Sequence, residues 1–255
     1  MTMAGITGGF DVGRVVQRTF AAISQHWLVF IGSAAILVGA PTFLNSLGQA
    51  MVFQGGDALG SSFLFTASGG FLSFIGAYIL QGAVVFATLN GLNGKRVDVG
   101  QTFAAGLRFF FPLLGVSILM GIGVAIGFIL LIVPGVILLI MWMVAVPAVV
   151  AEKAGVMESF QRSRDLTRGY RWKIFWLCLI YWIASTLISW TVLGAGGAAT
   201  GGLAAASTST ISLILTPVIA VITSIISATG VASIYYELRS IKEGVGAEQI
   251  ASVFD

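Results

Sequence analysis

The fold is decided by FFFPLLGVSILMGIGVAIGFILLIVPGVILLIMWMVAVPAVV, residues 109–150, a segment without a single charged residue. A helix crosses the roughly 30 Å hydrocarbon layer of a bilayer with about 20 apolar residues, so this segment is long enough for two passes. Val133-Pro134-Gly135 divides it, because Pro-Gly favours a turn and proline lacks an amide donor. We predict two membrane helices, about 111–132 and 135–151. A long kinked helix and a re-entrant pair are the alternatives.

The composition of the whole chain points the same way. Hydrophobic residues make up 57% of the sequence and charged residues 9%, whereas soluble domains carry about 25% charged residues. Four further apolar segments are long enough to span a membrane. The sequence therefore predicts an all-α integral membrane protein with six transmembrane helices in a single membrane domain, residues 1–255. The four additional helices are expected at about 27–52, 61–91, 172–192 and 209–236.

The distribution of charge predicts the orientation. With six passes both termini face the same side, and all 13 lysine and arginine residues fall on that side. The opposite loops, near 53–60, 133–135 and 193–208, carry only Asp57. Cytoplasmic loops of membrane proteins are enriched in lysine and arginine. Both termini are therefore predicted to be cytoplasmic.

Three related segments indicate an internal repeat. DVGRVVQRTFAA (11–22) and DVGQTFAA (98–105) share a beginning and an end, and GVMESFQR (155–162) is a weaker third copy. Apolar residues recur in the first two copies at helical spacing, which is typical of amphipathic helices at a membrane interface. We predict three parallel repeats, each an interfacial amphipathic helix followed by a transmembrane hairpin. Chance recurrence in a biased composition is the alternative. The repeats are placed at about 10–91, 98–151 and 155–238, followed by a short tail, 239–255.

Basic residues are concentrated in RSRDLTRGYRWK, residues 162–173. We predict that this segment lies in the longest cytoplasmic connection and fixes the orientation of the chain. Cations near the surface are also attracted to anionic lipid, and Arg162, Arg168 and Arg171 are the predicted headgroup contacts. A basic segment tethered between two membrane helices is short for a nucleic-acid site, so no nucleic-acid partner is expected.

Residues with catalytic or metal-binding patterns are scarce. The sequence contains no HExxH, CxxC, GxSxG or P-loop motif, and His26 is its only histidine. We therefore predict no catalytic residue, no metal and no cofactor. No ionisable residue falls at the centre of a predicted span, which argues against a proton-coupled transporter.

Three segments resemble a known family: VPAVVAEKAGVMESFQRSRDLTRGYRWKIF (146–175), LLIVPGVIL (130–138) and IYYELRSIKEG (234–244). They look like bacterial multipass proteins related to the membrane domain of membrane-anchored glycerophosphoryl diester phosphodiesterases. The resemblance implies a bacterial inner-membrane domain that holds or delivers a lipid-derived ligand. The diesterase activity is not carried over, because the hydrolase of that family is a separate soluble barrel. The family-like residues are Pro147, Glu152, Ser163, Leu166, Gly169, Trp172, Tyr236, Arg239 and Glu243.

Most of these family-like residues are predicted to form a cytoplasmic collar, namely Glu152, Ser163, Gly169, Trp172, Tyr236, Arg239 and Glu243. The leading functional prediction is a non-enzymatic inner-membrane protein that contacts or organises lipids, or serves as a scaffold. Its expected partners are membrane lipids, including anionic phospholipid, and a second copy or another membrane protein. The alternative is a transporter, channel or lipid flippase that uses a groove between repeats. A membrane enzyme that depends on Glu152 is the third possibility.

Overall fold

A computed structural model describes residues 9–53, 60–95, 97–200 and 209–244 of the chain, and the regular structure in these ranges is helical. Six segments within them are long and apolar enough to cross a membrane, in agreement with the predicted number. The helices are α1 (Val12–Gln25), α2 (Trp27–Ala34), α3 (Ala40–Phe53), α4 (Ser61–Leu92), α5 (Val99–Leu130), α6 (Ile132–Trp142), α7 (Ala145–Glu152), α8 (Val156–Thr167), α9 (Arg171–Thr200) and α11 (Thr210–Glu243), with a π-helical turn η1 (Ala35–Gly39) between α2 and α3.

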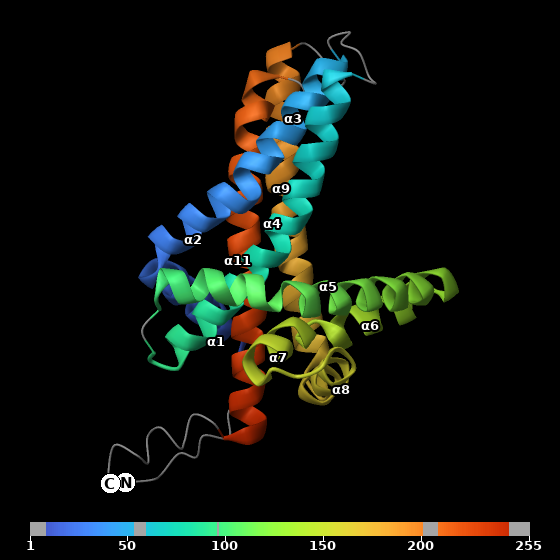
Figure 1. Cartoon of the computed structure of the whole chain (residues 1–255). Helices are drawn as coiled ribbons and strands as arrows, with labels where there is room; N and C mark the ends of the chain where they lie inside the picture. Colours follow the sequence, from blue (N-terminus) through green and yellow to red (C-terminus); the bar gives the residue numbers. More distant parts are fainter. Residues whose placement is uncertain (1–8, 54–59, 96, 201–208, 245–255) are drawn as a thin grey trace.

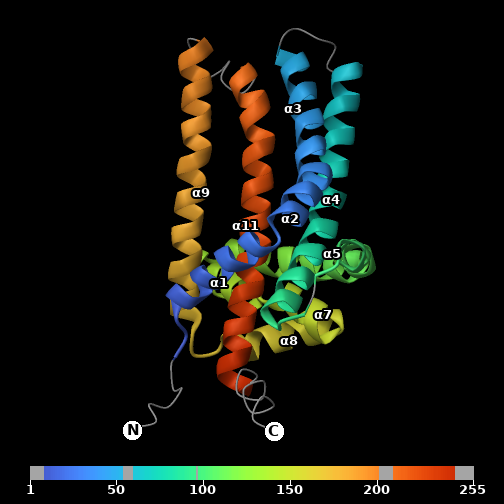
Figure 2. The same ribbon diagram turned by 90° about the vertical axis from the view of Figure 1, so that its left-hand side faces the viewer.

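Helices α3, α4, α9 and α11 stand upright, roughly side by side, in both views of the molecule (Figures 1 and 2). Helix α2 slopes towards them and joins α3 through η1. Pro41, the second residue of α3, has no amide hydrogen to continue a regular helix. Together, α2, η1 and α3 make up one candidate span, Trp27–Val52, which closely matches the predicted 27–52.

Helix α5 lies across the upright helices. It runs horizontally in Figure 1 and is seen nearly end-on in Figure 2, which is turned by 90° about the vertical axis. The predicted interfacial helix at 98–105 and nearly all of the predicted span at 111–132 belong to this one unbroken helix, Val99–Leu130. Pro112 lies inside it without ending it. A proline inside a helix removes one backbone hydrogen bond and its ring crowds the preceding turn, at a cost of about 3 kcal/mol. Burial of Leu113 and Val116, both fully buried, contributes about 1.5–3 kcal/mol each and offsets that cost.

The predicted division of the long apolar segment is confirmed, but it falls slightly earlier. Leu131 has an extended backbone (φ −169°, ψ 156°) and separates α5 from α6. Pro134 belongs to the first turn of α6, where a backbone amide has no helical acceptor in any case. The expected single helix at 135–151 is interrupted at Met143–Val144, so that α7 is a separate short helix.

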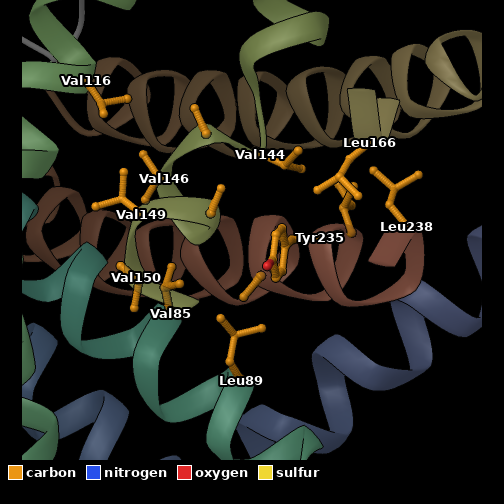
Figure 3. Close-up of a cluster of buried hydrophobic side chains, with 14 of the residues drawn as sticks. Val85, Leu89, Val116, Val144, Val146, Val149, Val150, Leu166, Tyr235 and Leu238 are labelled. Carbon is orange, nitrogen blue, oxygen red and sulfur yellow. The ribbon is translucent and has the colours of Figure 1, made fainter. Parts of the chain in front are cut away.

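Helix α7 occupies the centre of the largest core. Its residues from Ala145 to Val150 are all buried. Figure 3 shows side chains of α4, α5, α7, α8 and α11 converging here, and Tyr235 and Leu238 of α11 belong to the same cluster. With eight residues, α7 is too short to cross a membrane by itself. Its apolar composition is explained by protein that surrounds it on all sides.

The beginnings of the three predicted repeats share one local feature, a capped helix start. Asp11 accepts hydrogen bonds from the backbone of Gly13 and Arg14, and Asp98 accepts one from Gln101. At the third start, the Gly155 amide donates to Glu158 at 3.2 Å. These caps account for the shared DVG sequence of the first two copies. The repeat as a whole stays a prediction.

Candidate functional site

Every described lysine and arginine lies on a small set of elements that gather at one end of the molecule. These elements are α1, the turn after α4, the first half of α5, the α7–α8 region, the first turn of α9 and the last turns of α11. We call this end the charged layer. Asp57, the one charge predicted at the other end, lies outside the described residues. The charged layer also contains most of the residues singled out from the sequence.

Helix α8 is set crosswise in the charged layer by the turn that precedes it (Figure 2). Lys153 has a left-handed backbone (φ 54°) and ends α7. Two residues later Gly155 begins the cap of α8. Ser163 then donates a hydrogen bond to the carbonyl oxygen of Met141 at 2.8 Å, which ties α8 to the last turn of α6. Carbonyl groups in a last helical turn lack helical donors, so this bond satisfies one of them.

Arg162 is the centre of an ion network that joins α7, α8 and α11. It donates to Glu152 at 2.9 Å and pairs with Glu243. Glu243 also accepts from Arg239 at 2.8 Å, and the Tyr235 hydroxyl donates to Glu152 at 2.5 Å. We call these five residues the Arg162 network. Burial disfavours the charged guanidinium, but hydrogen bonds to Glu243 and Glu152 outweigh this effect and raise the pKa of Arg162.

The Arg162 network brings together three of the predicted collar residues, Glu152, Arg239 and Glu243. The other collar residues lie elsewhere. Gly169 provides a positive-φ turn (φ 93°) before α9, and Trp172 is 76% exposed. Tyr236 carries the guanidinium of Arg18 over its ring, at 5.0 Å from the ring centre, instead of joining the network. The collar is thus a set of separate contacts within one layer.

A second ion cluster, which sequence reasoning missed, fastens α1 to α11. Glu237 is only 2% exposed, and Arg14 donates to it at 2.7 and 2.9 Å. Arg18 pairs with the other oxygen of the same carboxylate. We call these three residues the Glu237 clasp. The hydrogen bond with Glu237 raises the pKa of Arg14. The only sequence signal was an acid near the end of an apolar span, because its partners are 223 and 219 residues away.

Two cavities meet beside α8 and the start of α9. A basic pocket of about 620 Å³ has three arginines in its wall, and an apolar groove of about 410 Å³ runs between α6 and α9. Arg171 lines both, and its Nε atom is buried without a hydrogen-bond partner in the described part of the chain. The pocket is lined by Met141, Trp142, Phe160, Gln161, Arg164, Asp165, Arg168 and Arg171, and the groove by Ile132, Val133, Val136, Ile137, Ile140, Arg171, Trp172 and Phe175.

The predicted headgroup contacts are divided between these features. Arg168 and Arg171 line the basic pocket, whereas Arg162 is held by two carboxylates outside it. Arg164 lines the pocket although the sequence reasoning did not select it. It lies four residues, about one helical turn, before Arg168, which directly follows α8, and this spacing is the signal that was available. With Asp165 as its only acid, the pocket lining carries a net positive charge that attracts anions.

The same residues are poorly suited to metal chemistry. Within the ranges 9–53, 60–95, 97–200 and 209–244, no three histidine, cysteine, aspartate or glutamate side chains gather closely enough to hold a metal ion. Glu152, the acid named for a possible enzyme, is occupied by Arg162 and Tyr235. The electrostatic character of the site is that of a cationic pocket next to an apolar groove.

Comparison with known protein families shows what this chain is similar to. The model of a family described as a domain of unknown function, DUF7847, matches residues 67–238. This region extends from α4 into the last turns of α11 and contains both cavities, Glu152, Arg162 and Tyr235. It leaves out α1 and the two arginines that hold Glu237. No curated protein and no solved structure matches the chain significantly.

Proposed function

The chain belongs to the DUF7847 family, and from that premise we propose that it is a non-enzymatic membrane protein that binds anionic lipid in its charged layer. The description of the family names no activity, so the proposal rests on the geometry of the site. One observation carries it: the basic pocket and the apolar groove adjoin each other and share Arg171.

A phospholipid has the same two parts in the same order. Its anionic headgroup suits Arg164, Arg168 and Arg171, and an acyl chain suits the groove between α6 and α9. Each cation near a negatively charged leaflet contributes about 1 kcal/mol to attraction. The buried Nε of Arg171 has no hydrogen-bond partner among the described residues, and a headgroup oxygen would supply one.

The proposal includes an orientation. Cations in membrane proteins favour the cytoplasmic side, so we place the charged layer in the cytoplasmic leaflet of a bacterial inner membrane, with both termini on that side. The resemblance to the membrane domain of glycerophosphoryl diester phosphodiesterases supports the same class of ligand, a lipid or lipid-derived molecule.

Native mass spectrometry of the full chain, released from bilayers that contain phosphatidylglycerol, tests the proposal. We expect the variant Arg164→Gln/Arg168→Gln/Arg171→Gln to bind this lipid more weakly. If each arginine contributes about 1 kcal/mol, the affinity falls roughly 100-fold.

A matched control removes cations from the same layer outside the pocket. Arg108 and Lys153 are both exposed, and neither lines the two cavities. The variant Arg108→Gln/Lys153→Gln should retain lipid binding. Equal losses of lipid affinity in the two variants would show that net charge, not the pocket, attracts the lipid. Unchanged binding in the pocket variant would show that the pocket is not the lipid site.

One observation favours a lipid flippase as the second candidate. An apolar cavity of about 300 Å³ lies between α1, α9 and α11, and Thr19, Tyr181 and Ser227 contribute polar groups to its wall. Such a cavity could admit an acyl chain on its way between leaflets. Movement of a fluorescent lipid between the leaflets of proteoliposomes, abolished by Gly230→Leu in this cavity, would favour the flippase over a binding protein.

A further inference from the structure

The hairpin of α5 and α6 projects from the upright helices as an arm, which we define as residues 117–139 (Figure 1). The two helical segments of the arm, from α5 and α6, pack closely on each other. An added Cβ at Gly127 would lie 2.9 Å from Cα of Gly135, and one at Gly135 would lie 2.6 Å from Cγ of Phe128, so both positions need glycine for this packing. These two glycines are the buried residues of the arm. The rest of its surface is at least partly uncovered.

The arm leaves the bundle from the point where α5 crosses the second half of α4. Helix α5 crosses α4 where Gly106 meets Ile79 and Gly82, and a Cβ at Gly106 would lie 2.5 Å from the carbonyl oxygen of Ile79. Gly82 follows Ser61, the first residue of α4, by 21 positions, or about 32 Å at 1.5 Å per residue. This distance equals about one hydrocarbon thickness. With Ser61, the start of this candidate span, taken as one edge of the membrane core, the crossing falls at the other edge.

The contact between α6 and α9 places the second half of the arm at the same level. The groove between them is lined by α6 residues from Ile132 to Ile140 but only by the first turn of α9, from Arg171 to Phe175. If α6 ran parallel to α9, it would contact a segment of α9 as long as its own lining segment. Instead it contacts only the first turn of α9, so α6 crosses α9 at an angle. Arg171 and Lys173 mark the point where α9 leaves the charged layer. The arm thus stays beside this boundary.

The surface of the arm is apolar on all sides. Ile118, Ile122 and Ile126 are 50–57% exposed, and Ile129 is 83% exposed. At the tip, Leu130, Leu131, Ile132 and Val133 are each at least 66% exposed. No charged residue occurs between Arg108 and Glu152. Leaving a large aliphatic side chain in water instead of burying it costs about 1.5–3 kcal/mol, so water is an unfavourable surrounding for this arm.

We propose that the arm lies in the plane of the membrane, embedded in the acyl chains of the leaflet next to the charged layer, and does not cross the bilayer. Its partner is the hydrocarbon of that one leaflet. The hairpin enters and leaves on the same side, so the proposal keeps both termini on one side. It goes beyond the proposed function, because it requires no anionic lipid and no bound ligand.

Nitroxide spin labels test the proposal in the full chain reconstituted in neutral phosphatidylcholine bilayers. Cysteines are introduced one at a time at Ile118, Ile122, Ile126 and Ile129 in a Cys178→Ala background. Collision rates with oxygen and with a water-soluble nickel chelate then report the depth of each label. The four residues lie along one helical face, so a spanning helix would give depths that change by about 16 Å from first to last. We expect no such trend.

Helix α11 provides the matched control. Ile214, Val218 and Ile222 have similar spacing and are 47–58% exposed, and an upright helix should give depths that change by about 12 Å between the outer two. A gradient in the arm as steep as that in α11 would show that the arm spans the bilayer. Low collision rates with both reagents along the arm would show that protein, such as a second copy, covers it. Either result would overturn the proposal.

Discussion

The charged layer contains two arginine–glutamate clusters that differ in burial. In the Glu237 clasp, one carboxylate that is 2% exposed receives two arginines. In the Arg162 network, Glu152 and Glu243 have side chains that are 24% and 29% exposed, and each has a second partner. The clasp joins helices from opposite ends of the chain, whereas the network joins α7 and α8 to α11.

This difference determines what each cluster contributes. A carboxylate deep in the protein cannot be rehydrated when its partners are removed. The charged Glu237 side chain therefore needs both arginines for the fold to be stable. The members of the Arg162 network retain other partners and some access to solvent, so the loss of one contact costs less. The clasp therefore specifies where α1 docks, and the network adjusts the stability of the α7–α8 region.

The largest effect is expected from Arg14→Gln/Arg18→Gln, which leaves the Glu237 carboxylate without its cations. Removing the partners of a buried charge typically costs roughly 3–5 kcal/mol. The free energy of unfolding, measured by tryptophan fluorescence during SDS titration in mixed micelles, should fall accordingly.

A third substitution checks the cause of this loss. Adding Glu237→Gln to the double variant replaces the charge by a neutral amide of similar volume, and it should restore part of the stability. If the triple variant is less stable than the double variant, the buried charge is not the reason for the loss.

An intermediate effect is expected from Arg162→Gln. Glu152 keeps the hydrogen bond from Tyr235, and Glu243 keeps the pair with Arg239, so the loss should be about 1 kcal/mol in the same titration. Arg164→Gln is the control, since Arg164 lies on the same helix and lines the pocket instead. A loss as large as that of the Arg14/Arg18 variant would remove the distinction between the clusters.

The smallest effect is expected from Arg239→Gln. Its pair with Glu243 is an i,i+4 pair with side chains about one-third exposed, and such pairs contribute about 0.3–0.5 kcal/mol. Salt screens exposed charges, so the effect should shrink when the titration is repeated at high NaCl concentration. An effect that is independent of salt would indicate that this pair is shielded from solvent like the clasp.

Local features of the site were predictable and distant ones were not. The cap that Asp98 provides for α5 depends only on local sequence, because Asp98 and Gln101 are three residues apart. Glu152, Arg239 and Glu243 were selected through short sequence motifs, and they do come together. Glu237 was missed because its cations lie on the first helix of the chain. Tyr235 was missed in favour of its neighbour Tyr236, since the two point to opposite partners.

The sequence by itself determined that the chain is helical, that six segments are long and apolar enough for a membrane, and that the long apolar segment divides near Pro134. Hydropathy, capping and proline effects depend on neighbouring residues, so they can be read along the chain. The tertiary structure decided that α5 lies across α4 and that Glu237 meets Arg14. An apolar composition favours contact with lipid but does not say how a helix is oriented. The close approach of Gly106 to α4 fixes the orientation of α5 across the upright helices.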